Sequence, residues 1–258
     1  RSRQLGSGLE FGAYRPYSQG DDLRRVDWNV YGRLDQLFLK LFEAPGQLRL
    51  LLALDAAPTM DFGVRNKWLA AKRVLAALGL VAQATADRVL LARYEDAAVQ
   101  SFDASGSEQA FLEAVAAMTV SREELPSAAV RSALAARGRD TVLLAATDMQ
   151  SKAGTLALLS EARRFGARAV VISLHADEEL QPQLEGLTRL SPLAGNPLKL
   201  RIDARVLEAY RKEVEDYRRA CQAAIRATGA GCIEVSSTVD LEPVVVELLR
   251  SGLLEGAR

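Results

Sequence analysis

Two aspartates stand where the sequence could support chemistry. Asp55 directly follows the apolar run of residues 47–54, and Asp148 comes two residues after the end of a second apolar run, residues 141–146. Runs of this kind are typical of buried parallel strands, and open α/β sheets bind ligands outside the carboxyl ends of their strands. Two carboxylates with the nearby hydroxyl of Thr59 form an oxygen-rich set that suits a hard divalent cation. The pattern therefore predicts a metal site, and the alternative is that both aspartates cap the turns that follow them.

The metal site predicted at Asp55, Thr59 and Asp148 is a degraded one. Its first loop is similar to the metal-adhesion loop of von Willebrand factor A domains, D-x-S-x-S, with Asp55 and Thr59 in place but Ala57 where a hydroxyl is needed. A further threonine ligand is expected near Ser127, and that stretch contains none. Because a hard cation needs several oxygen ligands, we expect no tightly bound metal and no other cofactor, with Mg²⁺ as the ion that a residual site would take.

Catalytic patterns are weak throughout the chain. The phosphatase motif D-x-D-x-T is matched by Asp55 and Thr59, but Ala57 stands in place of the general acid. The sequence has no G-x-S-x-G, P-loop or H-E-x-x-H motif. The single histidine, His175, would need a partner to act as a base, and the sequence shows none. We therefore expect a non-enzymatic protein, with a divalent-metal-dependent hydrolase that uses Asp55 and Asp148 as the alternative.

Strands and helices that alternate along the chain must position these residues. Beyond the two runs above, strands are predicted over residues 36–43, 87–94, 97–102, 168–174 and 232–235. Helices are predicted over residues 65–86, 107–118, 127–137, 153–166, 203–227 and 241–254. The alternation predicts an α/β fold, a Rossmann-like and mainly parallel sheet with helices on both faces.

Three local details add to this arrangement. The turn Pro45-Gly46 favours a hairpin between strands 36–43 and 47–54. Residues 178–199, broken by prolines and glycines, are expected to hold short edge strands. Asp203 is the expected N-cap of the long helix. The buried seam of that helix is predicted from spacings of three and four, at Leu207, Tyr210, Val214, Tyr217, Cys221 and Ile225.

Composition excludes several classes of function. The 258 residues carry 33 Lys and Arg against 33 Asp and Glu, so no overall basic field favours nucleic acid. There is no apolar run long enough for a transmembrane helix and no signal-peptide pattern. The two cysteines form no C-x-x-C pair and are expected to be reduced. We expect a cytoplasmic protein that can associate with a membrane through its partners.

The segment of residues 10–42 is rich in charged and aromatic side chains, with Pro16 and Gly20 as turn residues. We predict that three of its aspartates pair with three of its arginines in a network packed on an aromatic side chain; the residues are Asp21, Asp22, Asp27, Arg15, Arg24, Arg33 and Trp28. The network is either a structural clasp on the sheet edge or a surface that faces a partner. We expect residues 1–45 to form an N-terminal extension and residues 46–258 the α/β domain.

This segment and Asp55 together resemble a bacterial family, domain of unknown function 58, which has a von Willebrand A-like fold. The family pattern E-F-x-x-x-R-x-Y-x-x-G-D-D-x-R-x-I-D-W is matched at Glu10, Phe11, Arg15, Tyr17, Gly20, Asp21, Asp22, Arg24, Asp27 and Trp28, and basic residues follow at Arg33 and Lys40. Val26 replaces Ile, and Ala57 departs from the family's metal loop. The resemblance implies a von Willebrand A-like domain that works with MoxR-type AAA+ ATPases and von Willebrand A proteins in the assembly or maturation of other proteins. A fold alone implies no enzymatic activity.

Overall fold

The computed structural model describes residues 10–16, 30–31, 37–43, 49–84, 88–92, 99–102, 108–121, 125–137, 139, 141–191 and 196–250. The chain divides into two compact units, Arg1–Gly46 and Gln47–Ala257. Each unit is described by itself below.

The first unit contains a pair of strands, of which only the second was predicted from the sequence. Strand β1 (Glu10–Pro16) runs antiparallel to β2 (Phe38–Glu43), with an irregularity between Phe11 and Ala13. The expected hairpin across Pro45-Gly46 is therefore wrong, because β2 pairs with β1. Strand β3 (Arg49–Leu54) has both of its edges occupied by parallel neighbours, which leaves β2 no edge to pair with.

The second unit is built on a six-stranded sheet in the order β10-β7-β6-β3-β4-β5. The strands beside β3 are β4 (Arg88–Ala92), β5 (Val99–Phe102), β6 (Thr141–Thr147), β7 (Arg168–His175) and β10 (Gly231–Ser236). All pair in parallel except β5, which runs antiparallel to β4. The near-continuous apolar runs fit this position, since every residue of β6 is buried. The predicted α/β fold with a mainly parallel sheet is confirmed.

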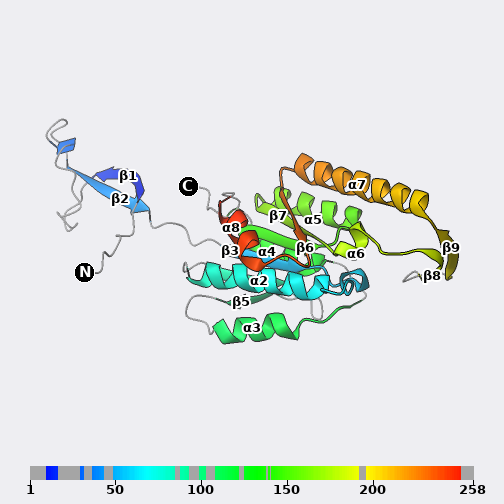
Figure 1. Cartoon of the computed structure of the whole chain (residues 1–258). Coiled ribbons are helices and arrows are strands. Elements are labelled where there is room, and N and C mark those ends of the chain that lie inside the picture. Colours follow the sequence, from blue (N-terminus) through cyan, green and yellow to red (C-terminus); the bar gives the residue numbers. More distant parts are fainter. Residues whose placement is uncertain are drawn as a thin grey trace, which may run out of the picture. The chain divides into compact units, whose positions relative to one another are not determined.

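Helices cover both faces of this sheet (Figure 1). Residues Leu50, Leu52 and Leu54 of β3 face a core that includes α2 (Lys67–Ala84), α3 (Glu108–Ala117) and α8 (Leu241–Arg250). The alternate residues Leu51 and Ala53 face the opposite core, which includes α4 (Ser127–Arg137) and α5 (Lys152–Arg164). The period of two along one strand thus divides its side chains between two helix layers.

The long helix α7 (Ala204–Ala227) lies on the same face as α5 and is only partly packed. Its N-cap is Asp203, as predicted, with Oδ1 accepting from the Val206 amide at 3.0 Å. Only two residues of the predicted seam, Cys221 and Ile225, are buried. Tyr210 and Tyr217 remain 40% and 43% exposed, because the N-terminal half of the helix has no comparable core beneath it.

The region before α7 contains short strands, as expected, but they form a sheet of their own and do not join the edge of the six-stranded sheet. A single helical turn, α6 (Asp177–Leu180), follows β7. Strands β8 (Gly186–Leu190) and β9 (Leu198–Ile202) then pair antiparallel as a separate two-stranded sheet. Within the described part of the chain, no helix is both long and apolar enough to cross a membrane.

Candidate functional site

At the carboxyl edge of the sheet, Asp55 joins two strand ends. Its carboxylate is 1% exposed. Oδ2 accepts from the Thr147 hydroxyl at 2.6 Å, and Oδ1 accepts from the Ala57 amide at 3.0 Å. Thr147 Oγ1 in turn accepts from the Met149 amide at 3.0 Å. The Thr147 hydroxyl and the Ala57 amide thus both donate to the Asp55 carboxylate, which would be costly to bury without hydrogen bonds.

The second predicted carboxylate, Asp148, is paired with a buried lysine. Lys67 Nζ lies 2.9 Å from Asp148 Oδ2 and 2.6 Å from Glu179 Oε1, and the lysine side chain is fully buried. Glu179 Oε2 also accepts from the Ala176 amide at 2.8 Å, which fixes the turn of α6. The Phe62 ring lies 5.8 Å from the ammonium. A lysine ammonium thus supplies the positive charge beside Asp148, as buried charges require.

Thr59, the third residue of the predicted metal set, lies in the 3-10 turn Pro58–Met60. Its hydroxyl oxygen is buried and has no hydrogen-bond partner among the described residues. The loop expected near Ser127 meets this edge at Ser121 instead, where the Ser121 amide donates to Ala56 O at 2.7 Å. In the part of the chain that the structure describes, no three His, Cys, Asp or Glu side chains are grouped to hold a metal. The predicted metal site stays a prediction.

Apolar side chains are exposed on the loop between β3 and α2 and on the first turn of α2. Phe62 is 47%, Val64 93% and Leu69 51% exposed. The backbone beneath them is fixed, because the Val64 amide donates to Glu178 Oε1 at 2.9 Å and Arg65 Nη1 donates to Thr238 O at 3.1 Å. The loop therefore holds large apolar groups in water on an ordered frame.

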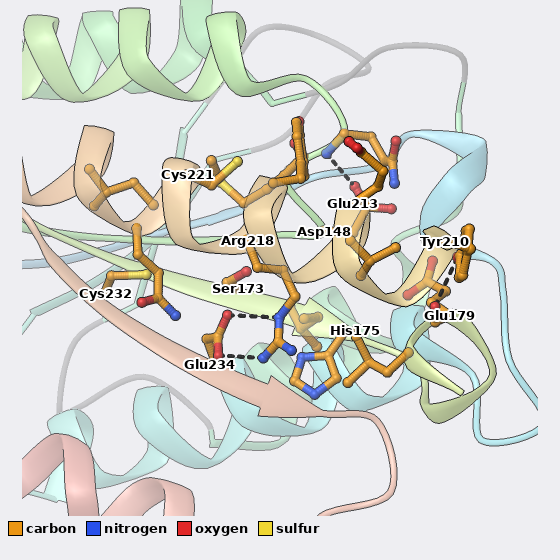
Figure 2. A pocket seen from close by; sticks show the side chains of 18 residues that line it. Asp148, Ser173, His175, Glu179, Tyr210, Glu213, Arg218, Cys221, Cys232 and Glu234 are labelled. Carbon is orange, nitrogen blue, oxygen red and sulfur yellow. Dashed lines mark hydrogen bonds and ion pairs between the residues drawn. The ribbon is translucent and has the colours of Figure 1, made fainter. Parts of the chain in front are cut away.

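A cavity of about 590 Å³ lies between α7 and the carboxyl ends of β6, β7 and β10. Arg218 reaches from α7 to Glu234 on β10 and donates through Nε at 3.1 Å and Nη2 at 2.5 Å, with His175 beside it (Figure 2). This two-point ion pair ties the helix to the edge strand of the sheet. Asp148 and Glu179 line the same cavity, so it adjoins the lysine cluster.

The electrostatics of the cavity follow from burial and from Arg218. Burial, assisted by the Arg218 charge, lowers the pKa of His175. Burial acts to raise the pKa of Glu234, but the hydrogen bonds from Arg218 and Gln222 together with the Arg218 charge hold it below its usual value. Burial and a hydrogen bond with Cys221 raise the pKa of Tyr217 to about 12. At neutral pH the cavity thus contains a neutral imidazole, a neutral phenol and an ionised Glu234.

Comparison with known families decides which group of proteins this architecture represents. The profile of the family described as "Protein of unknown function DUF58" matches residues 13–220, most of the chain. The chain belongs to the DUF58 family. The family resemblance drawn from the N-terminal pattern is thereby confirmed.

Curated relatives of this DUF58 chain are matched only over a short segment. Similar proteins are the uncharacterized proteins Mb1516 of Mycobacterium bovis and Rv1480 of Mycobacterium tuberculosis, each 38% identical over 58 residues. The match covers 22% of this chain and 18% of either relative. The chain thus spans about a fifth of the length of these relatives in the match.

Sequence reasoning missed Lys67 and Glu179. A signal for Lys67 was present, since it lies four residues before Ala71 and shares a helix face with the apolar Ala71, Leu75 and Leu78. A lysine on a buried face requires a counter-charge, but the sequence did not show which one. Glu179 stands 112 residues away, in the region whose structure was hardest to predict.

The N-terminal residues singled out by the DUF58 pattern fall largely outside the described residues. They are Tyr17, Asp21, Asp22, Arg24, Asp27, Trp28 and Arg33. Arg15 lies in β1, opposite Leu39 of β2. The ion-pair network predicted for this segment stays a prediction.

Proposed function

We propose that this DUF58 chain is a non-enzymatic protein-interaction module. The observation that carries the proposal is the loop at the carboxyl edge, where Val64 is 93% exposed on a hydrogen-bonded backbone. Exposed apolar side chains on an ordered loop favour association, because little conformational entropy is lost when they are covered. Phe62 and Leu69, which precede and follow Val64 in the sequence, are exposed apolar side chains as well.

The strand-end carboxylates support a structural role in place of chemistry. Asp55 is engaged by Thr147 and Ala57, and Asp148 by Lys67 and the Gln150 amide. Metal-assisted hydrolysis would need both carboxylates free to share an ion. The described contacts therefore add no support to the hydrolase alternative.

The class of partner comes from the family resemblance, which implies a MoxR-type AAA+ ATPase and the assembly or maturation of other proteins. We infer that the loop of residues 58–69 contacts this ATPase. A mixed surface of apolar side chains and charged neighbours is typical of such contacts. Membrane association would then come through the assembly.

The test is a binding measurement with the MoxR-type ATPase of the same genome, made without nucleotide, with ADP and with a slowly hydrolysed ATP analogue. We expect the double substitution Phe62→Ser and Val64→Ser to weaken binding about tenfold or more, as for two anchors of an interface. Leu112→Ser is the matched control, since Leu112 is an exposed leucine of α3 outside the loop. Absence of binding in all nucleotide states would contradict the ATPase as the partner. Binding of unchanged affinity in the double variant would contradict the loop as the contact surface.

A further inference from the structure

The cavity beneath α7 exists because the helix continues past its core. Cys221 and Ile225 bury its C-terminal half, while Tyr210, Val214 and Tyr217 stand over a space of about 590 Å³. A volume in the range of roughly 300–1,000 Å³ is typical of pockets that take a ligand or a partner's side chain. The cavity is thus large enough for a long side chain together with its neighbouring backbone.

Negative charge dominates the lining. The carboxylates are Asp148, Glu179, Glu213 and Glu234, and Arg218 is the cation among the lining residues. Lys67 engages the first two, and Arg218 engages Glu234. Glu213 has no partner among the described residues. A concave site of one charge sign concentrates ions of the opposite sign, so the cavity attracts a cation.

Two tyrosines are fixed beside this carboxylate. The Tyr210 hydroxyl donates to Glu179 O at 2.8 Å, and the Tyr217 hydroxyl donates to Met149 O at 2.8 Å. Met149 is held in the left-handed region, with φ of 61°, so that its carbonyl meets the tyrosine. Both rings remain partly exposed although their hydroxyls are bound. Tyrosine rings next to a carboxylate are suited to an organic cation.

The same features exclude ligands of the opposite charge. A phosphate or a nucleotide would need free cationic donors, and Arg218 is already bound at two points by Glu234. Figure 2 shows Asp148, Glu179 and Glu213 on the side of the cavity where Tyr210 lies, with Cys221 and Cys232 toward the other end. One end of the cavity is therefore acidic and aromatic, and the other end holds the two cysteines together with Glu234, whose charge Arg218 balances.

We propose that this cavity binds a lysine or arginine side chain of the protein partner. Glu213 is the counter-charge, and the rings of Tyr210 and Tyr217 are the walls beside the cation. The end with the two cysteines covers the methylene stem or a neighbouring residue of the partner. This inference rests on the proposed protein-interaction function and gives the partner a basic anchor residue.

The experiment is an NMR titration of the isotope-labelled chain with blocked tripeptides Gly-Arg-Gly, Gly-Lys-Gly and Gly-Gln-Gly. We expect saturable shifts at amides that line the cavity, such as those of Gln150 and Gln222, with the Arg and Lys peptides and not with the Gln peptide. Glu213→Gln should weaken binding of the basic peptides about three- to tenfold, as for loss of one partly exposed charge-assisted contact. Glu208→Gln is the matched control, since Glu208 is an exposed glutamate of α7 outside the cavity.

Three results would overturn the proposal. They are no saturable shift, equal shifts with the Gln peptide, and equal affinities of Glu213→Gln and Glu208→Gln. The loop of residues 58–69 is unchanged in both variants, so ATPase binding that persists alongside such a result would leave the proposed function standing. Conversely, loop variants that lose ATPase binding but bind the basic peptides normally would show that the cavity works independently of the loop.

Discussion

The ammonium of Lys67 lies 2.9 Å from a carboxylate oxygen of Asp148, and the two side chains are 0% and 1% exposed. The pair joins the first turn of α2 to the end of β6, and Glu179 adds α6 to the same cluster. Since the contact is almost free of water, both charges depend on each other for stabilisation.

Removal of the lysine should destabilise the fold strongly. We expect Lys67→Met to lower the free energy of unfolding by about 3–5 kcal/mol, because two carboxylates lose their cation. Chemical denaturation provides the measurement. Arg73→Met is the control on the same helix, since Arg73 is exposed, and it should cost less than about 0.5 kcal/mol. Lys67→Met combined with Asp148→Asn should cost less than the sum of the single changes, and strict additivity would contradict the coupling.

The metal prediction can be tested together with this pair. We expect millimolar Mg²⁺ or Mn²⁺ to leave the thermal midpoint of the natural chain equal to that in NaCl of matched ionic strength. Lys67→Gln should create a cation response, because it leaves Asp148 and Glu179 without a positive charge, and Asp148→Asn should remove that response. Thermal-shift assays provide the comparison. Cation stabilisation of the natural chain that Asp55→Ala abolishes would instead demonstrate a working metal site and revive the hydrolase alternative.

The exposed loop depends on a glycine with no room for a side chain. Gly63 has φ of +96°, and an added Cβ would lie 2.8 Å from Ala176 Cβ and 3.1 Å from Arg65 O. We expect Gly63→Ala to cost about 2–4 kcal/mol, from left-handed strain and overpacking together. Gly229→Ala is the matched control, with φ of +85° and open space around it, and it should cost about 1–2 kcal/mol from strain alone. Equal losses of unfolding free energy in the two variants, measured in urea, would show that the close approach to Ala176 adds no cost.

The sequence predicted those features of the fold that local residue patterns determine, and it missed those that depend on pairing between distant segments. Buried runs such as residues 141–146 and the cap at Asp203 were predictable, since burial and capping determine them locally. The partner of β2 was not, because a Pro-Gly turn favours a hairpin only when the next strand has a free edge. Likewise, Asp55 and Asp148 were found as strand-end residues, but their partners Thr147 and Lys67 follow from the tertiary fold.

The pKa of the single histidine, His175, can be measured and reports the electrostatics of the cavity. Burial and the Arg218 charge lower the pKa of His175, so its NMR titration should give a value below the usual one of about 6.5. A lowered folded-state pKa means that the histidine contributes stability above about pH 6.5, and this contribution is lost as the pH falls toward the folded value. The free energy of unfolding should therefore decrease below about pH 6.5, and His175→Gln should remove this part of the slope.

Arg218→Met should raise the His175 pKa, because it removes the neighbouring cation and frees the Glu234 carboxylate. Arg219→Met is the matched control, since Arg219 is the next residue of α7 and pairs with the exposed Glu215. An unchanged titration in Arg218→Met, or an equal shift in Arg219→Met, would mean that Arg218 does not govern the charge of this cavity. A rise confined to Arg218→Met would show that the Arg218 charge acts together with burial to keep the imidazole neutral, and so to preserve the acidic balance that a basic side chain would meet.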